Sequence, residues 1–160
     1  MCDYEIESKF FIIKITGGSI IITEKETNRI IKKFSGFTYL YTGDIHPNET
    51  QFFALENGKH FYVYSLETFE LIKRITLPRT YKSRDVIGFY SSNGSLINIP
   101  AQRYISEDKE KWIGHHEYVL FTYETQNYTL VSKTELKDLK KFRWPETHWD
   151  KLLDILAKLR

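Results

Sequence analysis

Two stretches of this chain are nearly the same and lie 41 residues apart: ETNRIIKKF at residues 26–34 and ETFELIKRI at residues 67–75. The similarity extends without a gap over residues 17–35 and 58–76, with identical Gly, Glu, Thr, Ile and Lys positions. Internal similarity at a period of about 20–50 residues is typical of repeat architectures, in which each unit buries its apolar face against the next. This repeat therefore restricts the fold more than any other feature of the sequence.

One repeat unit reads as four short antiparallel strands. A first strand ends at the turn signal PN at 47–48, and QFFALE, HFYVYS and ELIKRIT follow as further strands. The turns between them are NG at 57–58, which tolerates positive φ, and ET at 67–68. Because aromatic and β-branched residues favour strands, each unit of about 41 residues is predicted to be a small sheet.

A third unit is visible in altered form. Residues 85–99 repeat the first half, with Asp85 lying 41 residues after Asp44, and EYVLFTYETQNYTLVSK repeats the second half. Matching the two ET turns places this half 57 residues after the second unit, so we expect an insertion of about 16 residues, AQRYISEDKEKWIGHH at 101–116. Its charged centre predicts a loop tip, and loops on rigid scaffolds often carry function.

The segment DIHPNETQFFALENGKHFYVYSLETFELIKRI resembles a blade of the WD40-like β-propeller family, and the resemblance covers roughly residues 9–133. The shared pattern is an Asp with apolar residues, a Pro-Asp-Gly-like turn, two apolar strands and an acidic-Thr turn. Tyr64-Ser65 stands where the family has Trp-Asp, and a Gly-His pair at the start of the unit is missing. The resemblance implies a mainly β fold of antiparallel four-stranded WD40-like blade repeats.

The number of repeats raises a problem of closure. Propellers close with about 4–8 blades, whereas three units are visible here, and the first lacks an obvious first strand. An open array leaves strand edges and apolar faces exposed. We expect homodimerisation, a partner protein, or the C-terminal region to cover them, with a propeller-like domain at 1–133 and a helical cap or arm at 134–160 packed on the same domain.

The C-terminal region reads as helical. A short helix is predicted from Thr134, and Pro145 interrupts it. A second helix presents apolar residues on one face: Trp149, Leu152, Leu153, Leu156 and Leu159. This face either packs on the chain's own sheet or binds a partner's groove, with Trp149, Leu152 and Leu156 as contact residues.

Composition indicates a soluble, cytoplasmic protein. The net charge of +2 is too small to imply a membrane or nucleic-acid partner. A lone Cys2 cannot form an internal disulfide, and the acidic N-terminus is unlike a signal peptide. The abundance of Lys, Ile, Tyr and Asn indicates an AT-rich coding genome, as in some bacteria, whose small proteins include toxin-neutralising immunity proteins; that role is kept as a hypothesis.

The candidates for catalysis are few. Asp44 and His46 form an i, i+2 pair, which permits a carboxylate–imidazole contact. His115 and His116 are adjacent, so a regular strand would point them to opposite faces. We therefore predict no catalytic residue, no metal and no cofactor, and keep a small hydrolase or metal-dependent enzyme using Asp44/His46 or His115/His116 as an alternative.

Two surfaces are candidates for binding. Tyr104, Trp112, His115 and His116 lie in the insertion, and Trp, Tyr and Arg dominate interface hot spots. The basic stretch KKFRW would offer Lys140, Lys141 and Arg143 to nucleic acid, but acidic residues flank it. The sequence thus favours a non-enzymatic protein–protein interaction module that binds a protein partner or itself, with nucleic-acid binding as the second alternative.

Overall fold

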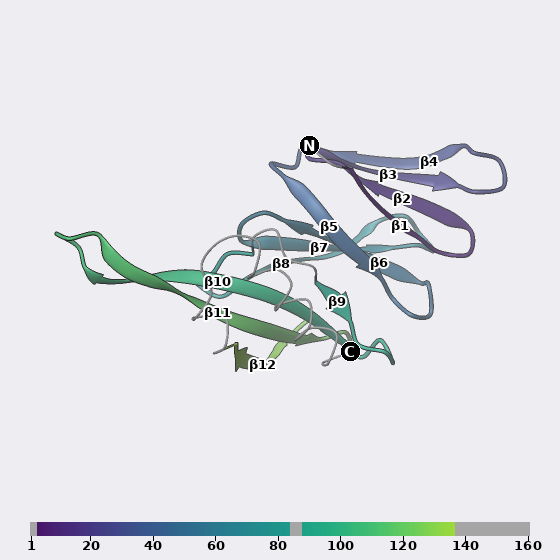
Figure 1. The fold of residues 1–160 in the computed structure, drawn as a ribbon. Coiled ribbons are helices and arrows are strands. Elements are labelled where there is room, and N and C mark those ends of the chain that lie inside the picture. The colour runs from purple at the N-terminus through teal and green to yellow at the C-terminus, as the bar shows by residue number, and fades with distance from the viewer. Residues whose placement is uncertain (1–2, 84–87, 137–160) are drawn as a thin grey trace.

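The computed structural model describes residues 3–83 and 88–136, which form three four-stranded antiparallel sheets (Figure 1). In each sheet, strands that follow one another in the chain are neighbours. The first sheet holds β1 (Tyr4–Glu7), β2 (Phe11–Ile15), β3 (Ser19–Glu24) and β4 (Ile30–Ser35); the second holds β5 (Leu40–Ile45), β6 (Gln51–Glu56), β7 (His60–Ser65) and β8 (Leu71–Thr76); the third holds β9 (Phe89–Tyr90), β10 (Leu96–Asp108), β11 (Ile113–Glu124) and β12 (Leu130–Glu135).

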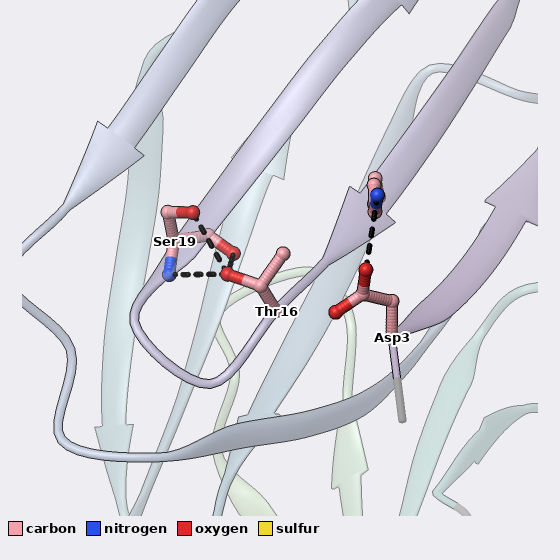
Figure 2. A network of polar contacts seen from close by, with 4 residues as sticks. Asp3, Thr16 and Ser19 are labelled. Atoms are coloured by element: carbon pink, nitrogen blue, oxygen red, sulfur yellow. Dashed lines mark hydrogen bonds and ion pairs between the residues drawn. The ribbon is translucent and has the colours of Figure 1, made fainter. Parts of the chain in front are cut away.

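The prediction of a mainly β chain built from repeated four-stranded units is confirmed. The first unit has the strand that its polar sequence obscured, because YEIE alternates apolar and acidic residues and pairs along β2. The turn from β2 to β3 is closed by Thr16, whose Oγ1 accepts the N–H of Ser19 at 3.0 Å (Figure 2). No helix long and apolar enough to span a bilayer occurs in the part of the chain that the structure describes.

The 41-residue repeat is also present in the backbone. The outer hairpins β3–β4 and β7–β8 each carry a bulge, after Ile22 and after Val63, 41 residues apart. Their turns each contain one residue with positive φ, Asn28 at 56° and Phe69 at 58°. The repeated nonapeptide is therefore the outer strand of two equivalent sheets together with the turn that leads into it.

The third sheet contains the same hairpin in a register that differs from the predicted one. Tyr128 has a φ of 60° and the bulge follows Thr122, which places the hairpin 59 residues after the second sheet and not 57. Glu124 therefore corresponds to Ser65. The match of the ET dipeptides was wrong because both residues act through a side-chain acceptor: Ser65 Oγ accepts the N–H groups of residues 67 and 68, and the Glu124 carboxylate accepts those of residues 126 and 127.

The first hairpin of the third sheet is shifted as well. The N–H of His46 donates to the carbonyl of Gln51, and the N–H of Ser91 donates to that of Leu96, an offset of 45 residues where 41 was predicted. Phe89 thus corresponds to Asp44, and Asp85 lies outside the described residues. Since the offset grows from 45 to 59 across β10 and β11, this hairpin carries 14 more residues than its counterpart in the second sheet.

The second sheet packs on both neighbours. Because side chains alternate between the two faces of a strand, Phe52 and Ala54 enter the core shared with the first sheet, and Phe53 and Leu55 enter the core shared with the third. Every residue of β6 after Gln51 is buried. Each large apolar side chain buried in this way contributes about 1.5–3 kcal/mol, so face-to-face stacking of the sheets is the main stabilising feature.

The first strands of the sheets lie side by side. β5 contacts both β1 and β9, whereas the fourth strands β4, β8 and β12 are largely exposed at the periphery. β12 continues through Thr134 and Glu135, which pair with Leu120 and Val119. A helix therefore does not begin at Thr134, because this β-branched residue extends the sheet. The predicted tail contacts, Trp149, Leu152, Leu156, Lys140, Lys141 and Arg143, lie outside the described residues.

Candidate interaction surface

β10 and β11 project beyond the three sheets as a two-stranded ribbon (Figure 1). They contain 13 and 12 residues, against 6 each in β6 and β7. Beyond the pair Ala101–Val119, pairing continues to Asp108–Ile113, and we call residues 102–118 the arm. The loop predicted at 101–116 is thus mostly paired strand, and only residues 109–112 form the turn at its tip.

A buried carboxylate holds the base of the arm. The side chain of Glu117 accepts hydrogen bonds from the Tyr81 hydroxyl at 2.9 Å and from Arg103 Nε at 2.7 Å. Lys133 Nζ, from β12, lies 3.6 Å from the same carboxylate. Arg103 and Lys133 also lie over the Tyr81 ring. These four residues, the Glu117 cluster, connect the arm to the segment after β8 and to the outer strand of its own sheet.

The Glu117 cluster keeps its carboxylate ionised. Burial raises the pKa of Glu117, but the hydrogen bonds from Arg103 and Tyr81 outweigh this effect, so that its pKa lies below the usual value. The charged partners are partly exposed, and they give the buried carboxylate a route for its field to reach solvent. This ionised anchor fixes the direction in which the arm leaves the sheet.

The tip of the arm carries an exposed tryptophan. Asp108 Oδ1 accepts the N–H of Glu110 at 3.0 Å, which shapes the turn. Trp112 follows with a φ of 57° and is 89% exposed. An indole held in solvent by a defined turn offers a large apolar surface whose backbone is already ordered, and this is an arrangement that favours binding.

One face of the arm is aromatic. Tyr104 and His116 are cross-strand partners with ring centroids 5.4 Å apart, and Tyr118 follows on the same face. Tyr104 is 54% exposed and lies over Gly114, where any Cβ would collide with its hydroxyl. Glycine is therefore needed at position 114 for the tyrosine to lie flat across the ribbon.

An open hollow of about 320 Å³ adjoins this aromatic face at the base of the arm. It is lined by polar and basic side chains: Thr80, Lys82, Gln102, Arg103, Tyr104 and His116. Lys82 and Gln102 exchange two backbone hydrogen bonds of 2.9 Å, which close the wall of the hollow. The aromatic face and the hollow are continuous, so a bound partner would meet both.

The four predicted residues of the insertion are placed on different parts of the arm. Tyr104 and His116 are together on the aromatic face, whereas Trp112 is at the tip. His115 points to the opposite face from His116, where its Nδ1 lies 2.9 Å from Glu107. In residues 3–83 and 88–136, no group of three or more His, Cys, Asp or Glu side chains is arranged to hold a metal ion.

Asp44 and His46 join the second and third sheets. Asp44 Oδ2 accepts the N–H of Tyr90 at 2.9 Å, and its Oδ1 accepts that of Ile45 at 3.0 Å. His46 Nδ1 accepts the N–H of Asn48, so its Nε2 is the donor to the carbonyl of Gly94, 2.9 Å away. The pair considered for catalysis thus makes backbone hydrogen bonds between two neighbouring turns.

The sequence did not identify the Glu117 cluster. Tyr81, Arg103 and Lys133 are far apart in the chain and meet only through strand register and the segment after β8. One signal was available: Glu117 stands among apolar residues of a predicted strand, and a buried acid in such a strand requires partners.

Comparison with known proteins was made at three levels. No protein-family model matches this chain, and no curated protein matches it. Solved structures do match. Dihydro-heme d1 dehydrogenase NirN in complex with DHE superposes with a TM-score of 0.58 at 12% identity, over 81% of this chain and 25% of that one. The tricorn protease superposes with a TM-score of 0.57 at 14% identity, over 77% of this chain and 12% of that one.

These matches concern propeller domains, and the repeated four-stranded sheets agree with them. The fold is propeller-like. The chain spans a quarter or less of the length of these structures, and at such low identity the likeness shows the fold alone.

Proposed function

We propose that this protein is a non-enzymatic protein-interaction module that binds a protein partner through its arm. The observation that carries the proposal is the arm itself: 14 residues beyond what the sheet requires, which place Trp112 and Tyr104 in solvent. Large aromatic side chains of this kind dominate the energetics of protein interfaces.

The chemistry of the arm indicates what the partner offers. Trp112, Tyr104 and Ile113 are exposed apolar side chains. Around them the arm carries charges of both signs, including Glu107, Lys109 and Lys111. An apolar groove with a rim of mixed charge complements such a surface, because the rim charges then select the partner and the aromatics supply the affinity.

The non-enzymatic part of the proposal is supported by the roles of the alternative catalytic residues. Asp44 and His46 make backbone hydrogen bonds that join two sheets. Among propeller-like folds we favour a WD40-like blade, on the basis of the Asp44 acceptor and of the equivalent turns at residues 24–29, 65–70 and 124–129. A toxin-neutralising role is one form that such binding takes.

The partner is either a different protein or a second copy of the chain. Three sheets fall short of the four to eight blades of a closed propeller, and pairing of two copies would bring six together. Size-exclusion chromatography with light scattering tests this pairing directly, since a dimer has twice the mass of 19.1 kDa.

The arm is tested by affinity capture from cells of the source organism, using the full chain, Trp112→Ala and Tyr104→Ala. We expect a protein captured by the wild type to be lost with both variants. With that protein purified, Trp112→Ala should weaken binding about 30-fold, the equivalent of a hot spot of about 2 kcal/mol. Trp112→Ala should leave stability within about 0.5 kcal/mol, because the side chain is almost fully exposed.

Phe10→Ala is the matched control. Phe10 is an aromatic residue 59% exposed on the first sheet, and it should be dispensable for capture. Identical protein sets captured by the wild type and by Trp112→Ala would contradict the proposal, as would equal losses with Trp112→Ala and Phe10→Ala.

A further inference from the structure

The two end sheets each have one face that does not pack on a neighbouring sheet, and these free faces differ in character. The free face of the first sheet is charged. Lys14 Nζ lies 2.9 Å from Asp3 there (Figure 2), and Glu5 is the cross-strand neighbour of Lys14. Both members of the ion pair are more than 40% exposed. A terminal repeat with a polar outer face is stable in water without further cover.

The free face of the third sheet is buried. Asn98 pairs with Phe89 on one side and with Thr122 on the other, and Leu120 lies on the same face opposite Pro100. Phe89 is 0% and Leu120 is 3% exposed, and Asn98 and Thr122 are buried with them. The alternate residues of these strands, such as Ile97 and Phe121, enter the core shared with the second sheet. The buried set therefore points away from that core.

The described strands do not account for this burial. Neither of the two cores formed by residues 3–83 and 88–136 includes Phe89 or Leu120. Asn98 and Thr122 satisfy one another through a hydrogen bond of 2.8 Å, as polar groups do on a face from which water is excluded. A further apolar element must therefore cover this face.

The chain itself supplies a suitable element. Leu136, also buried outside both cores, donates its N–H to the carbonyl of Tyr118 at the edge of this same sheet. Twenty-four residues follow it in the sequence. A helix over 147–160, expected from the spacing of Trp149, Leu152 and Leu156, would be about 21 Å long. The buried strands β9 to β11 span only about 10 Å at the usual strand spacing.

We propose that residues 147–160 lie across the free face of the third sheet of the same chain, with their apolar side chains on Phe89, Leu120 and Leu136. The first sheet of a second copy is a poor alternative, because docking it here would remove the charges of Asp3, Lys14 and Glu5 from water. Both ends of the stack then have a finished surface, and three sheets persist as an open arc without closing into a ring.

Trp149 serves as the reporter for this contact. In full-length protein carrying Trp112→Phe and Trp144→Phe, Trp149 is the single tryptophan. We expect its emission to be blue-shifted and protected from acrylamide in the native state, with both properties lost in urea. Leu120→Ala should increase quenching, whereas Leu130→Ala, at an exposed position on the outer strand of the same sheet, should not.

Three results would overturn the proposal. One is a native Trp149 that is quenched as readily as in urea. A second is equal quenching in Leu120→Ala and its parent. The third is protection accompanied by a mass of twice 19.1 kDa, since a second copy would then supply the cover. If Leu120→Ala fails to fold, Leu156→Asp in the segment replaces it, with Lys158→Asp as the matched control. These experiments contain no partner, so they stand or fall independently of the proposed function of the arm.

Discussion

Replacing Glu117 by Gln tests whether a single buried charge secures the arm. The substitution keeps the shape of the side chain but removes the charge that accepts from Tyr81 and Arg103. Hydrogen bonds to a buried charged group are worth about 1.5–3 kcal/mol each. The partly exposed Arg103 and Lys133 contribute less, as surface partners do. Since the amide still accepts one hydrogen bond, we expect a net loss of about 2 kcal/mol.

Urea unfolding followed by circular dichroism measures this loss. At a slope of about 2 kcal/mol per molar urea, the midpoint should fall by about 1 M, and Tm should fall by about 4–8 °C for a chain of this size. Glu107→Gln is the matched control. Glu107 is in the same arm and pairs with His115, but both are exposed, so its effect should be within about 0.5 kcal/mol.

The pH dependence tests the electrostatic part of the reasoning. Because the pKa of Glu117 is lower in the folded protein than its ordinary value of 4.5, its contribution is full above that value and is lost as the pH falls through the folded pKa. The difference between wild type and Glu117→Gln should therefore shrink between pH 7 and about pH 3. Equal midpoints for Glu117→Gln and Glu107→Gln at pH 7, or a difference that stays constant into acid, would refute the reasoning.

Two further substitutions test other parts of the structure. Gly114→Ala should distort the arm and cost about 1–3 kcal/mol, because the new Cβ would lie 2.5 Å from the carbonyl oxygen of Ile105; amide spectra should change in residues 102–118, whereas Gly18→Ala, with its nearest neighbour 3.9 Å away, should leave them as they are. Asp44→Ala should lower the free energy of unfolding by about 1–3 kcal/mol, because the N–H of Tyr90 loses its acceptor; the exposed Asp3→Ala is the control in the same urea assay, and equal midpoints for the two would contradict a linking role for Asp44.

Local signals predicted the fold best where turn and strand residues agreed. The second sheet follows its predicted strands because NG at 57–58 and the ET turn at 67–68 mark both of its later hairpins. The third sheet was misaligned because different residues fill the same structural role, Ser65 in one hairpin and Glu124 in the other. Backbone geometry repeats there although residue identity does not.

The candidate surface was predicted in outline but not in its geometry. Tyr104 and Trp112 were expected to be exposed in the insertion, and they are. Its charged centre suggested a loop, whereas strand pairing continues to Asp108 because each added residue finds a cross-strand partner. The Glu117 cluster could not be predicted, since its members come from three segments that only tertiary packing brings together.

The arm extends a hairpin symmetrically, and this has a consequence for how the protein can diversify. Residues are added to β10 and β11 in pairs beyond Ala101 and Val119, so the register within the sheet is the same with or without them. Lengthening, shortening or rewriting the ribbon therefore leaves every inward side chain of the third sheet on its own face. Recognition and folding are thus encoded in separable parts of one hairpin, and related chains can exchange their specificity by grafting this ribbon alone.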